Sequence, residues 1–265
     1  MILTFLGTGT STGIPVLGCH CPTCLSQDPR DRRLRASALL TTDTGRHVMI
    51  DCGPDMRQQL LQHHNGSIDG VVITHSHYDH TGGVDDLRTL SYTSGIDIYC
   101  REDVADDLRR VLPYCFNNSG YPNVAWLRLN NIREMEPFQV AGIEFTPLPV
   151  MHGKLPILGF KTGSLAYITD ATVIPPETTD AIKGIDTLVI NALRHTPNPT
   201  HQNLEQALAI VRKVAPRRTY LIHMSHQMGL HAEESSRLPD SVQFAYDGLE
   251  IEIPDPLTPT CKDNA

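Results

Sequence analysis

The sequence predicts an α/β (α+β) fold in which two β-sheets pack face to face and helices cover their outer faces, a four-layer arrangement. Two observations predict it. Short, apolar, strand-like runs bounded by Gly, Pro, Asn or Asp recur in two rounds, and helical segments lie between them. The length of 265 residues suits a single domain over 1–265, because single α/β or sandwich domains commonly reach about 200–250 residues.

The strand-like runs of the first round cover residues 2–6, 38–42, 47–50, 71–74 and 96–99. Those of the second round cover residues 124–129, 143–147, 158–162, 165–169, 188–191, 219–222, 242–246 and 249–253. The clearest helix is expected over 203–215, because its apolar residues recur at helical spacing and Pro216 follows its end. Helical patterns also cover 56–63, 103–112 and 176–183. We expect segment 91–122 to be irregular, either a lid over a site or a plain surface excursion.

Charge and composition exclude several classes of protein. The chain has 30 acidic and 22 basic side chains, a net charge of −8 and no long basic block, so its field repels nucleic acid. The apolar run at its start is short and lacks a basic flank, and no run is long enough to span a membrane. We therefore expect a cytoplasmic protein. Seven cysteines, an odd number, argue against a disulfide framework.

The strongest chemical signal is the sequence THSHYDH at 74–80, which directly follows an apolar run. It places His75, His77, Asp79 and His80 at the end of an expected buried strand. Imidazole nitrogens and carboxylate oxygens suit Zn, Mn or Fe, and two groups of such ligands hold a pair of metals about 3.5–4 Å apart. The alternative is a polar turn with incidental histidines, but the density of ligands favours a metal site.

A site for two metals needs ligands from distant parts of the chain. His152, Asp170 and His223 each follow an apolar run, at the expected end of a strand. Taken alone, each is better explained as a cap, a turn residue or a hydrogen-bonded histidine, but their shared position favours metal ligands. Asp51 follows the run 47–50 and either orients ligands or simply starts the turn DCGP.

Together these residues resemble the metallo-β-lactamase superfamily, from residue 2 to about residue 253. The resemblance implies an αββα sandwich of two mixed sheets and a dinuclear site for divalent ions, Zn or Mn. The resemblance implies that His75, His77 and His152 bind one metal. It implies that Asp79, His80 and His223 bind the other, and that Asp170 bridges the two.

A second cluster, GCHCPTC at 18–24, places Cys19, Cys21 and Cys24 in one loop. Three thiolates at this spacing supply three quarters of a tetrahedral zinc site, and the alternative is three metal-free thiols. With the late sequence HxxH at 223–226, the loop resembles the PhnP-like cyclic phosphodiesterase branch of the superfamily. The resemblance implies that His226 completes a structural zinc site, and His20 is the rival fourth ligand.

The glycine-rich sequence GTGTSTG at 7–13 does not fit a dinucleotide-binding loop. Its glycines are spaced one residue too widely, and Pro15 follows where the phosphate-binding helix would begin. We expect a turn whose hydroxyl groups, those of Thr8, Thr10 and Ser11, approach the metal site.

The predicted function is hydrolysis of a small phosphate ester, such as a cyclic ribose phosphate, by a hydroxide that bridges two metals. The candidate catalytic residues are Asp79 and His201. His201 precedes the helix 203–215, where this branch carries a histidine, and an imidazolium can protonate a leaving alkoxide. His195 and His231 are rivals for that role.

Three alternatives remain open at this point: a tRNA 3′ processing nuclease, a lactonase or thioesterase, and a non-catalytic metal-binding scaffold. The net charge counts against the nuclease. The expected partner is a small-molecule phosphate ester, with no nucleic acid and no membrane. A homodimer is common in the resembled group.

Overall fold

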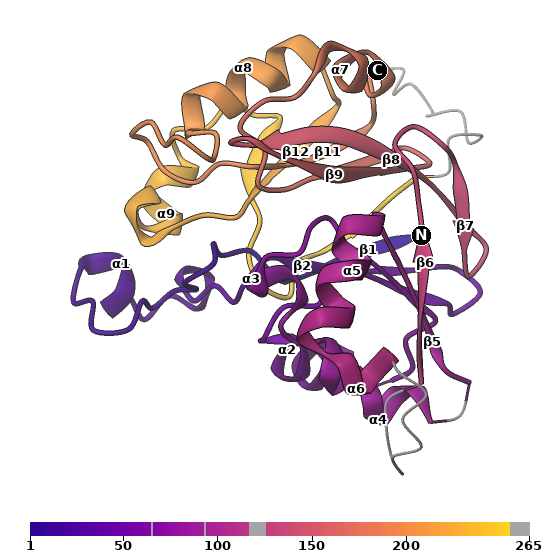
Figure 1. Cartoon of the computed structure of the whole chain (residues 1–265). Coiled ribbons are helices and arrows are strands. Elements are labelled where there is room, and N and C mark those ends of the chain that lie inside the picture. Colours follow the sequence, from indigo (N-terminus) through magenta and orange to yellow (C-terminus); the bar gives the residue numbers. More distant parts are fainter. Residues whose placement is uncertain (65, 93, 117–125, 255–265) are drawn as a thin grey trace.

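The computed structural model of the chain describes residues 1–64, 66–92, 94–116 and 126–254. Within these residues, the strands form two mixed sheets of seven. The sheets lie face to face, and helices cover the outer face of each (Figure 1). The predicted four-layer sandwich is therefore confirmed.

The first sheet has the spatial order β14–β1–β2–β3–β4–β5–β6. Neighbours from β14 to β3 are antiparallel, whereas β3 to β6 run parallel. Its strands are β1 (Ile2–Gly7), β2 (Ser37–Thr41), β3 (His47–Ile50), β4 (Gly70–Val72), β5 (Ile96–Cys100), β6 (Leu127–Asn131) and β14 (Glu250–Glu252).

The second sheet has the order β13–β12–β11–β10–β9–β8–β7, antiparallel from β7 to β10 and parallel from β10 to β13. Its strands are β7 (Phe138–Val140), β8 (Ile143–His152), β9 (Leu155–Thr162), β10 (Leu165–Ile168), β11 (Thr187–Asn191), β12 (Arg218–Ile222) and β13 (Val242–Phe244). β8 continues past the predicted end at 147 to His152, because its whole length pairs with β9. The short edge strand β7 has no counterpart among the predicted runs.

Helices cover both outer faces (Figure 1). α2 (Met56–His63), α4 (Arg88–Ser91), α5 (Glu102–Val111) and α6 (Pro113–Phe116) lie over the first sheet, and α7 (Pro176–Ala181), α8 (Leu204–Val214) and α9 (His231–Ser235) lie over the second. The connecting segments hold α1 (Pro22–Leu25), α3 (Tyr78–Thr81) and the 3-10 turns η1 (Pro29–Asp31), η2 (Val84–Leu87) and η3 (His226–Met228).

α8 shows why these residues form a helix of this length. Asn203 accepts a hydrogen bond from Gln206 N at 2.9 Å while the Gln206 side chain receives one from Asn203 N, a capping box. Its buried face, which includes Ala207 and Val211, packs on the second sheet. The helix ends where Ala215 adopts a left-handed backbone, directly before a proline.

Apolar clusters separate the four layers. One lies between the sheets and joins Phe5 and Leu40 of the first sheet to Phe145 and Phe160 of the second. Another joins the first sheet to α2 and α5, and a third joins the second sheet to α7 and α8. This burial on both faces explains why the strands read as continuous apolar runs in the sequence.

Within the segment 91–122 that was expected to be irregular, β5 and α5 confirm the strand predicted over 96–99 and the helix predicted over 103–112, and the helix α6 was not predicted. The buried side chains Val104, Ala105 and Leu108 hold α5 against the first sheet. Residue 93 and residues 117–122 lie outside the described residues. No helix in the described part of the chain is long and apolar enough to cross a membrane.

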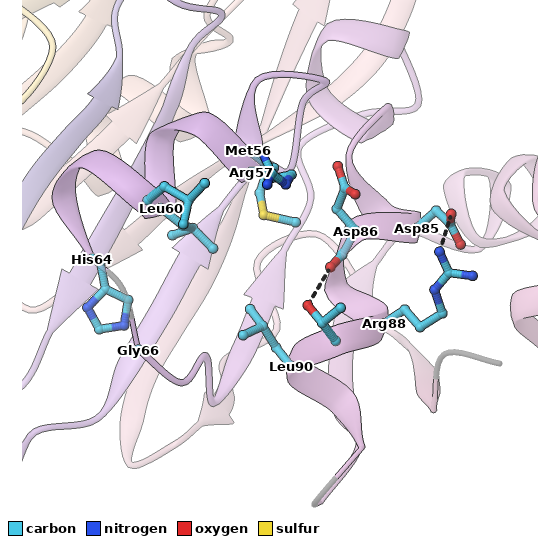
Figure 2. A pocket seen from close by; sticks show the side chains of 11 residues that line it. Met56, Arg57, Leu60, His64, Gly66, Asp85, Asp86, Arg88 and Leu90 are labelled. Carbon is cyan, nitrogen blue, oxygen red and sulfur yellow. Dashed lines mark hydrogen bonds and ion pairs between the residues drawn. The ribbon is translucent and has the colours of Figure 1, made fainter. Parts of the chain in front are cut away.

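A pocket of 190 Å³ opens between α2 and the η2–α4 segment (Figure 2). Leu60 and Leu90 line it together with charged groups, and Asp85 pairs with Arg88 at its rim at 3.6 Å. None of the metal-ligand candidates lines this pocket.

Candidate metal centre and active site

The ends of five strands carry the candidate ligands and their supports. β4 leads into the motif at 75–80, β8 ends at His152, β10 leads to Asp170 and β12 leads to His223. β3 leads to Asp51. The carboxyl ends of neighbouring parallel strands lie at one edge of a sheet, so the topology brings these distant residues together.

Two groups of side chains come together there. In each group, the candidate ligand atoms all lie within 4.8 Å of one another. The groups are His75, His77 and His152, and Asp79, His80, Asp170 and His223. All seven sequence-predicted ligands are thus brought into one cluster, and Asp170, the bridge that the resemblance implies, lies both in the second group and in a further group with His152 and His201. His77 is exposed whereas the other six are buried, so the cluster opens to solvent at His77.

Hydrogen bonds on the outer side orient the imidazoles. His80 Nδ1 lies 2.7 Å from Asp51 Oδ2, and His75 Nδ1 lies 3.0 Å from Thr74 Oγ1. His152 Nδ1 lies 2.9 Å from the carbonyl oxygen of Asp170. Each contact engages Nδ1 and leaves Nε2 directed toward the cluster, the arrangement that metal-binding histidines adopt. Of the two interpretations of Asp51, the structure supports the one that orients a ligand.

The buried carboxylates and imidazoles of the cluster shift each other's pKa values. Burial works to raise the pKa of Asp170, but His223 and His80 outweigh it and hold that pKa well below its ordinary value. Burial works to lower the pKa of His80, but Asp51 and Asp170 hold it well above its ordinary value. Burial lowers the pKa of His75 well below its ordinary value, so this imidazole is neutral, the form in which histidine binds a metal.

The donor set fits a pair of divalent cations. The buried Nε2 atoms of His75, His80 and His223 make no well-directed hydrogen bond within the described residues. A buried polar atom without a partner is costly, and a bound cation would remove that cost here. Two carboxylates among five imidazoles match the ligands that zinc and manganese take.

Three residues of the site have left-handed backbone. Asp51, Asp170 and His223 have φ values of 59°, 56° and 56°. Each follows the end of a strand, where the left-handed turn redirects the chain and aims the side chain into the cluster. Such a backbone is uncommon for residues other than glycine and is found most often where function requires it.

Of the three histidines considered as proton donors, only His201 contacts the cluster of candidate metal ligands. Its Nε2 lies 3.0 Å from Asp170 Oδ1, and its ring stacks on that of His223 at a centroid distance of 5.0 Å. His195 instead contacts Glu234 at 3.0 Å. His231 is buried near Phe244, and burial lowers its pKa to about 4.

The glycine-rich turn borders the site by its backbone. Thr10 N donates to Met224 O at 3.0 Å, and Met224 N donates to Thr8 O at 3.1 Å, directly beside His223. The Thr8 hydroxyl, however, donates to Asp247 at 2.8 Å and so does not extend toward the metal groups. The expectation for Thr8 is therefore wrong, because a buried carboxylate takes its proton.

The cysteine loop forms a separate cluster with His226. His226 Nδ1 lies 3.3 Å from the sulfur atoms of both Cys19 and Cys21 and 3.6 Å from that of Cys24. Burial opposes it, but hydrogen bonds from the Cys24 backbone and from His226 lower the pKa of Cys21 to about 6. Three thiols and one imidazole are a donor set that suits tetrahedral zinc. His20 is exposed and lies outside this group.

The structure adds supporting residues that sequence reasoning misses. Thr74 joins Asp51 to His75, because its hydroxyl donates to Asp51 at 2.9 Å. The carbonyl of Thr200 accepts from His152 Nδ1 at 2.7 Å, and Asn198 holds the turn before His201. A short Asn-Pro-Thr sequence before a helix is a turn signal, but it does not show which residue the turn supports.

Comparisons with known proteins agree with this geometry. Residues 46–224 match the family model described as a beta-lactamase superfamily domain. A crystal structure described as a new diphosphatase from the PhnP family is 38% identical, covers 94% of this chain and 96% of that chain, and superposes with a TM-score of 0.88. The human short-form tRNase Z is 19% identical with a TM-score of 0.70, covering 96% of this chain and 100% of that chain, which shows the fold alone.

Curated relatives are longer than this chain. An octanoyltransferase of Porphyromonas gingivalis is 43% identical over 249 residues, which are 94% of this chain and 51% of that protein. Coenzyme PQQ synthesis protein B of Nitrosococcus oceani is 29% identical over 170 residues, 57% of this chain and 54% of that protein. The chain spans about half the length of these relatives.

Proposed function

The chain belongs to the metallo-β-lactamase superfamily, in its PhnP-like branch, and we propose that this hydrolase is a metal-dependent phosphodiesterase acting on a small phosphate ester. The observation that carries the proposal is the contact between His201 Nε2 and Asp170 Oδ1 at 3.0 Å. The contact supports a role for His201 as a proton donor at the edge of a ligand set for two metals, which is the combination that expulsion of an alkoxide requires.

We propose that two divalent ions, Zn or Mn, are held by the two groups of ligands, with Asp170 between them. Bound there, the ions would supply an activated water near neutral pH and neutralise charge on the phosphoryl oxygens. The protein's own part is to hold the ligands in place. Asp79 stays ionised for this role, because His223 and His80 keep its pKa below the ordinary value although burial opposes them.

His201 would complete the reaction. As the oxygen of water adds to phosphorus and one of the water protons passes to solvent, the ester P–O bond breaks and the leaving oxygen takes the proton from His201 Nε2. The proton thus ends on the alcohol product, and the phosphate monoester keeps the added oxygen. Substrate would enter beside His77, the exposed member of the cluster.

Activity of the purified protein with added Mn or Zn tests the proposal. We expect cleavage of a bis(aryl) phosphate and of a ribose cyclic phosphate, and a diphosphate ester is included because the PhnP-family relative is described as a diphosphatase. Inactivity on all three, together with hydrolysis of a lactone or thioester, would show that the proposal is wrong. Asp79→Ala should abolish turnover, whereas a non-catalytic scaffold would keep its binding role.

Two other substrates need separate probes. The octanoyltransferase name belongs to a protein of which this chain matches 51%, so the name does not assign acyl transfer to the matched half, and an octanoyl thioester tests it. For tRNA processing, the net charge of −8 counts against binding. Binding of RNA that appears at low salt and weakens steeply with added salt would favour the nuclease.

We also propose that Cys19, Cys21, Cys24 and His226 hold one structural zinc. The support is the closeness of three sulfur atoms to one imidazole nitrogen, 3.3–3.6 Å. Metal analysis should then give about three ions per chain, one of them resistant to chelation, as expected for a closed structural site. Two ions or fewer, all removed together by a chelator, would contradict this assignment.

A further inference from the structure

The side chain of Asn198 lies at the centre of the turn that leads to His201. Its Oδ1 accepts from Thr200 N at 2.9 Å, from Thr200 Oγ1 at 2.9 Å and from His201 N at 3.1 Å. Backbone N–H groups can only donate, so two of them meeting at one atom require that atom to be the amide oxygen. The backbone therefore fixes the orientation of the Asn198 amide.

This oxygen gives the adjoining hydrogen bonds a direction. Because Oδ1 only accepts, the Thr200 hydroxyl donates its single proton to Asn198. The Thr200 oxygen then accepts from its other neighbour, His201 Nδ1, which is 3.0 Å away. Nδ1 is thereby held as a donor, and Nε2 is the nitrogen that faces Asp170 Oδ1.

The backbone of this turn is anchored by other contacts. The Thr200 carbonyl accepts from His152 Nδ1 at 2.7 Å and also from the Thr172 hydroxyl. Gln202 N donates to Ala171 O at 3.0 Å, next to Asp170. Loss of the Thr200 hydroxyl therefore leaves the backbone of the turn in place and removes the nearer of the two oxygen atoms that face His201 Nδ1, since Asn198 Oδ1 lies 3.4 Å from it.

We propose that Asn198 and Thr200 are positioning residues for His201, whose ring they orient so that Nε2 delivers its proton to the leaving oxygen. The proposal rests on the proposed phosphodiesterase function. When the ester P–O bond breaks, the proton of Nε2 passes to the leaving oxygen while Nδ1 keeps its own. His201 then remains as a neutral imidazole of one tautomer, with its hydrogen bond to Thr200 unchanged.

Two diesters with different leaving groups test this role. A bis(nitrophenyl) phosphate releases a stable phenolate that departs without a proton, whereas a ribose cyclic phosphate releases an alkoxide that requires one. General acid catalysis contributes about 10²–10⁴-fold, so we expect Thr200→Val to lower kcat on the cyclic phosphate about 10–100-fold. On the aryl diester the change should stay within about threefold, with KM little altered on either substrate.

Matched variants distinguish a role of Thr200 in orienting the His201 ring from a general effect on the fold of the loop. Thr200→Ser keeps the hydroxyl and should restore the rate on the cyclic phosphate. Thr196→Val alters an exposed threonine of the same loop and should behave as the wild type on both substrates. Adding Thr200→Val to His201→Ala should cause no further loss, because the two residues act as a unit.

Nitrogen NMR of the histidine rings gives a readout that does not depend on turnover. In the protein without added metal, His201 Nδ1 should carry a proton, and in Thr200→Val this preference should be weaker, because only the more distant Asn198 Oδ1 remains as an acceptor. Equal losses on both diesters, additive losses in the double variant, or an Nδ1 signal unaffected by Thr200→Val would overturn the inference. An unmodified protein that cleaves neither diester would instead refute the proposed function, and the NMR signal would still decide the hydrogen-bond chain.

Discussion

Replacing Asp51 by Asn should weaken metal binding although Asp51 itself is not expected to touch a metal. Asp51 is fully buried; its Oδ1 accepts from Thr74 N at 2.8 Å and its Oδ2 faces His80 Nδ1 at 2.7 Å. In Asp51→Asn the amide oxygen keeps the Thr74 contact, so the NH₂ group faces His80. That group donates, His80 Nδ1 must then accept, and the ring proton moves to Nε2, the nitrogen meant for the metal.

The magnitude follows from the role of such outer hydrogen bonds. Loss of a partner that orients a metal-bound histidine typically costs about 10–100-fold in affinity. At about 1.4 kcal/mol for each tenfold, this is roughly 1.4–2.8 kcal/mol. The affinity should decrease for the ion expected at His80, Asp79 and His223. The affinity for the ion expected at the cysteine loop should not change.

Competition between the metal-depleted protein and a coloured zinc chelator measures the effect. Asp55→Asn is the matched control, because Asp55 lies in the same turn but binds Arg35 at 2.9 Å. We expect wild-type affinity for Asp55→Asn and a weakened class of sites for Asp51→Asn. Wild-type affinity in Asp51→Asn would refute the argument from the tautomer of His80.

Three further predictions concern the rest of the chain. Cys21→Ser should remove one chelation-resistant ion while leaving the others, as metal analysis will show. Asn203→Ala should lower the free energy of unfolding by about 1 kcal/mol in urea denaturation, because it removes the capping box of α8. Burial raises the pKa of Asp247 to about 7, so the folded chain retains a proton that the unfolded chain loses, and stability should fall as pH rises from about 4 to 7. Asp247→Asn should flatten that fall, and a parallel pH dependence in both proteins would contradict this account.

Much of the fold was readable from periodicity and turn residues, because nearly every long strand is buried on both faces. The helix at 204–214 shows its apolar face and its cap directly in the sequence. β7 escaped prediction because a three-residue edge strand has too little pattern, and its identity depends on pairing with β8. In segment 91–122 the strand over 96–99 and the helix over 103–112 were accessible, but the helix α6 was not, because four residues carry too little pattern.

The ligand set was accessible for a different reason. Metal chemistry restricts the residue types, and strand ends restrict where they occur, so His152 and Asp170 stand out despite their distance from the motif. The roles of Thr74 and Asn198 were not accessible, because Thr and Asn are common in turns. Only the coordinates show that one supports His75 and the other supports His201.

The left-handed backbone at Asp51, Asp170 and His223 has a consequence for how this sequence can change over evolutionary time. At such a conformation, glycine is more stable than a residue with a Cβ atom by roughly 1–2 kcal/mol. Selection for greater folding stability therefore favours glycine at these three positions, whereas selection for activity disfavours it. A homologue with glycine at Asp170 or His223 would be recognisable as one that has given up hydrolysis and gained thermal tolerance.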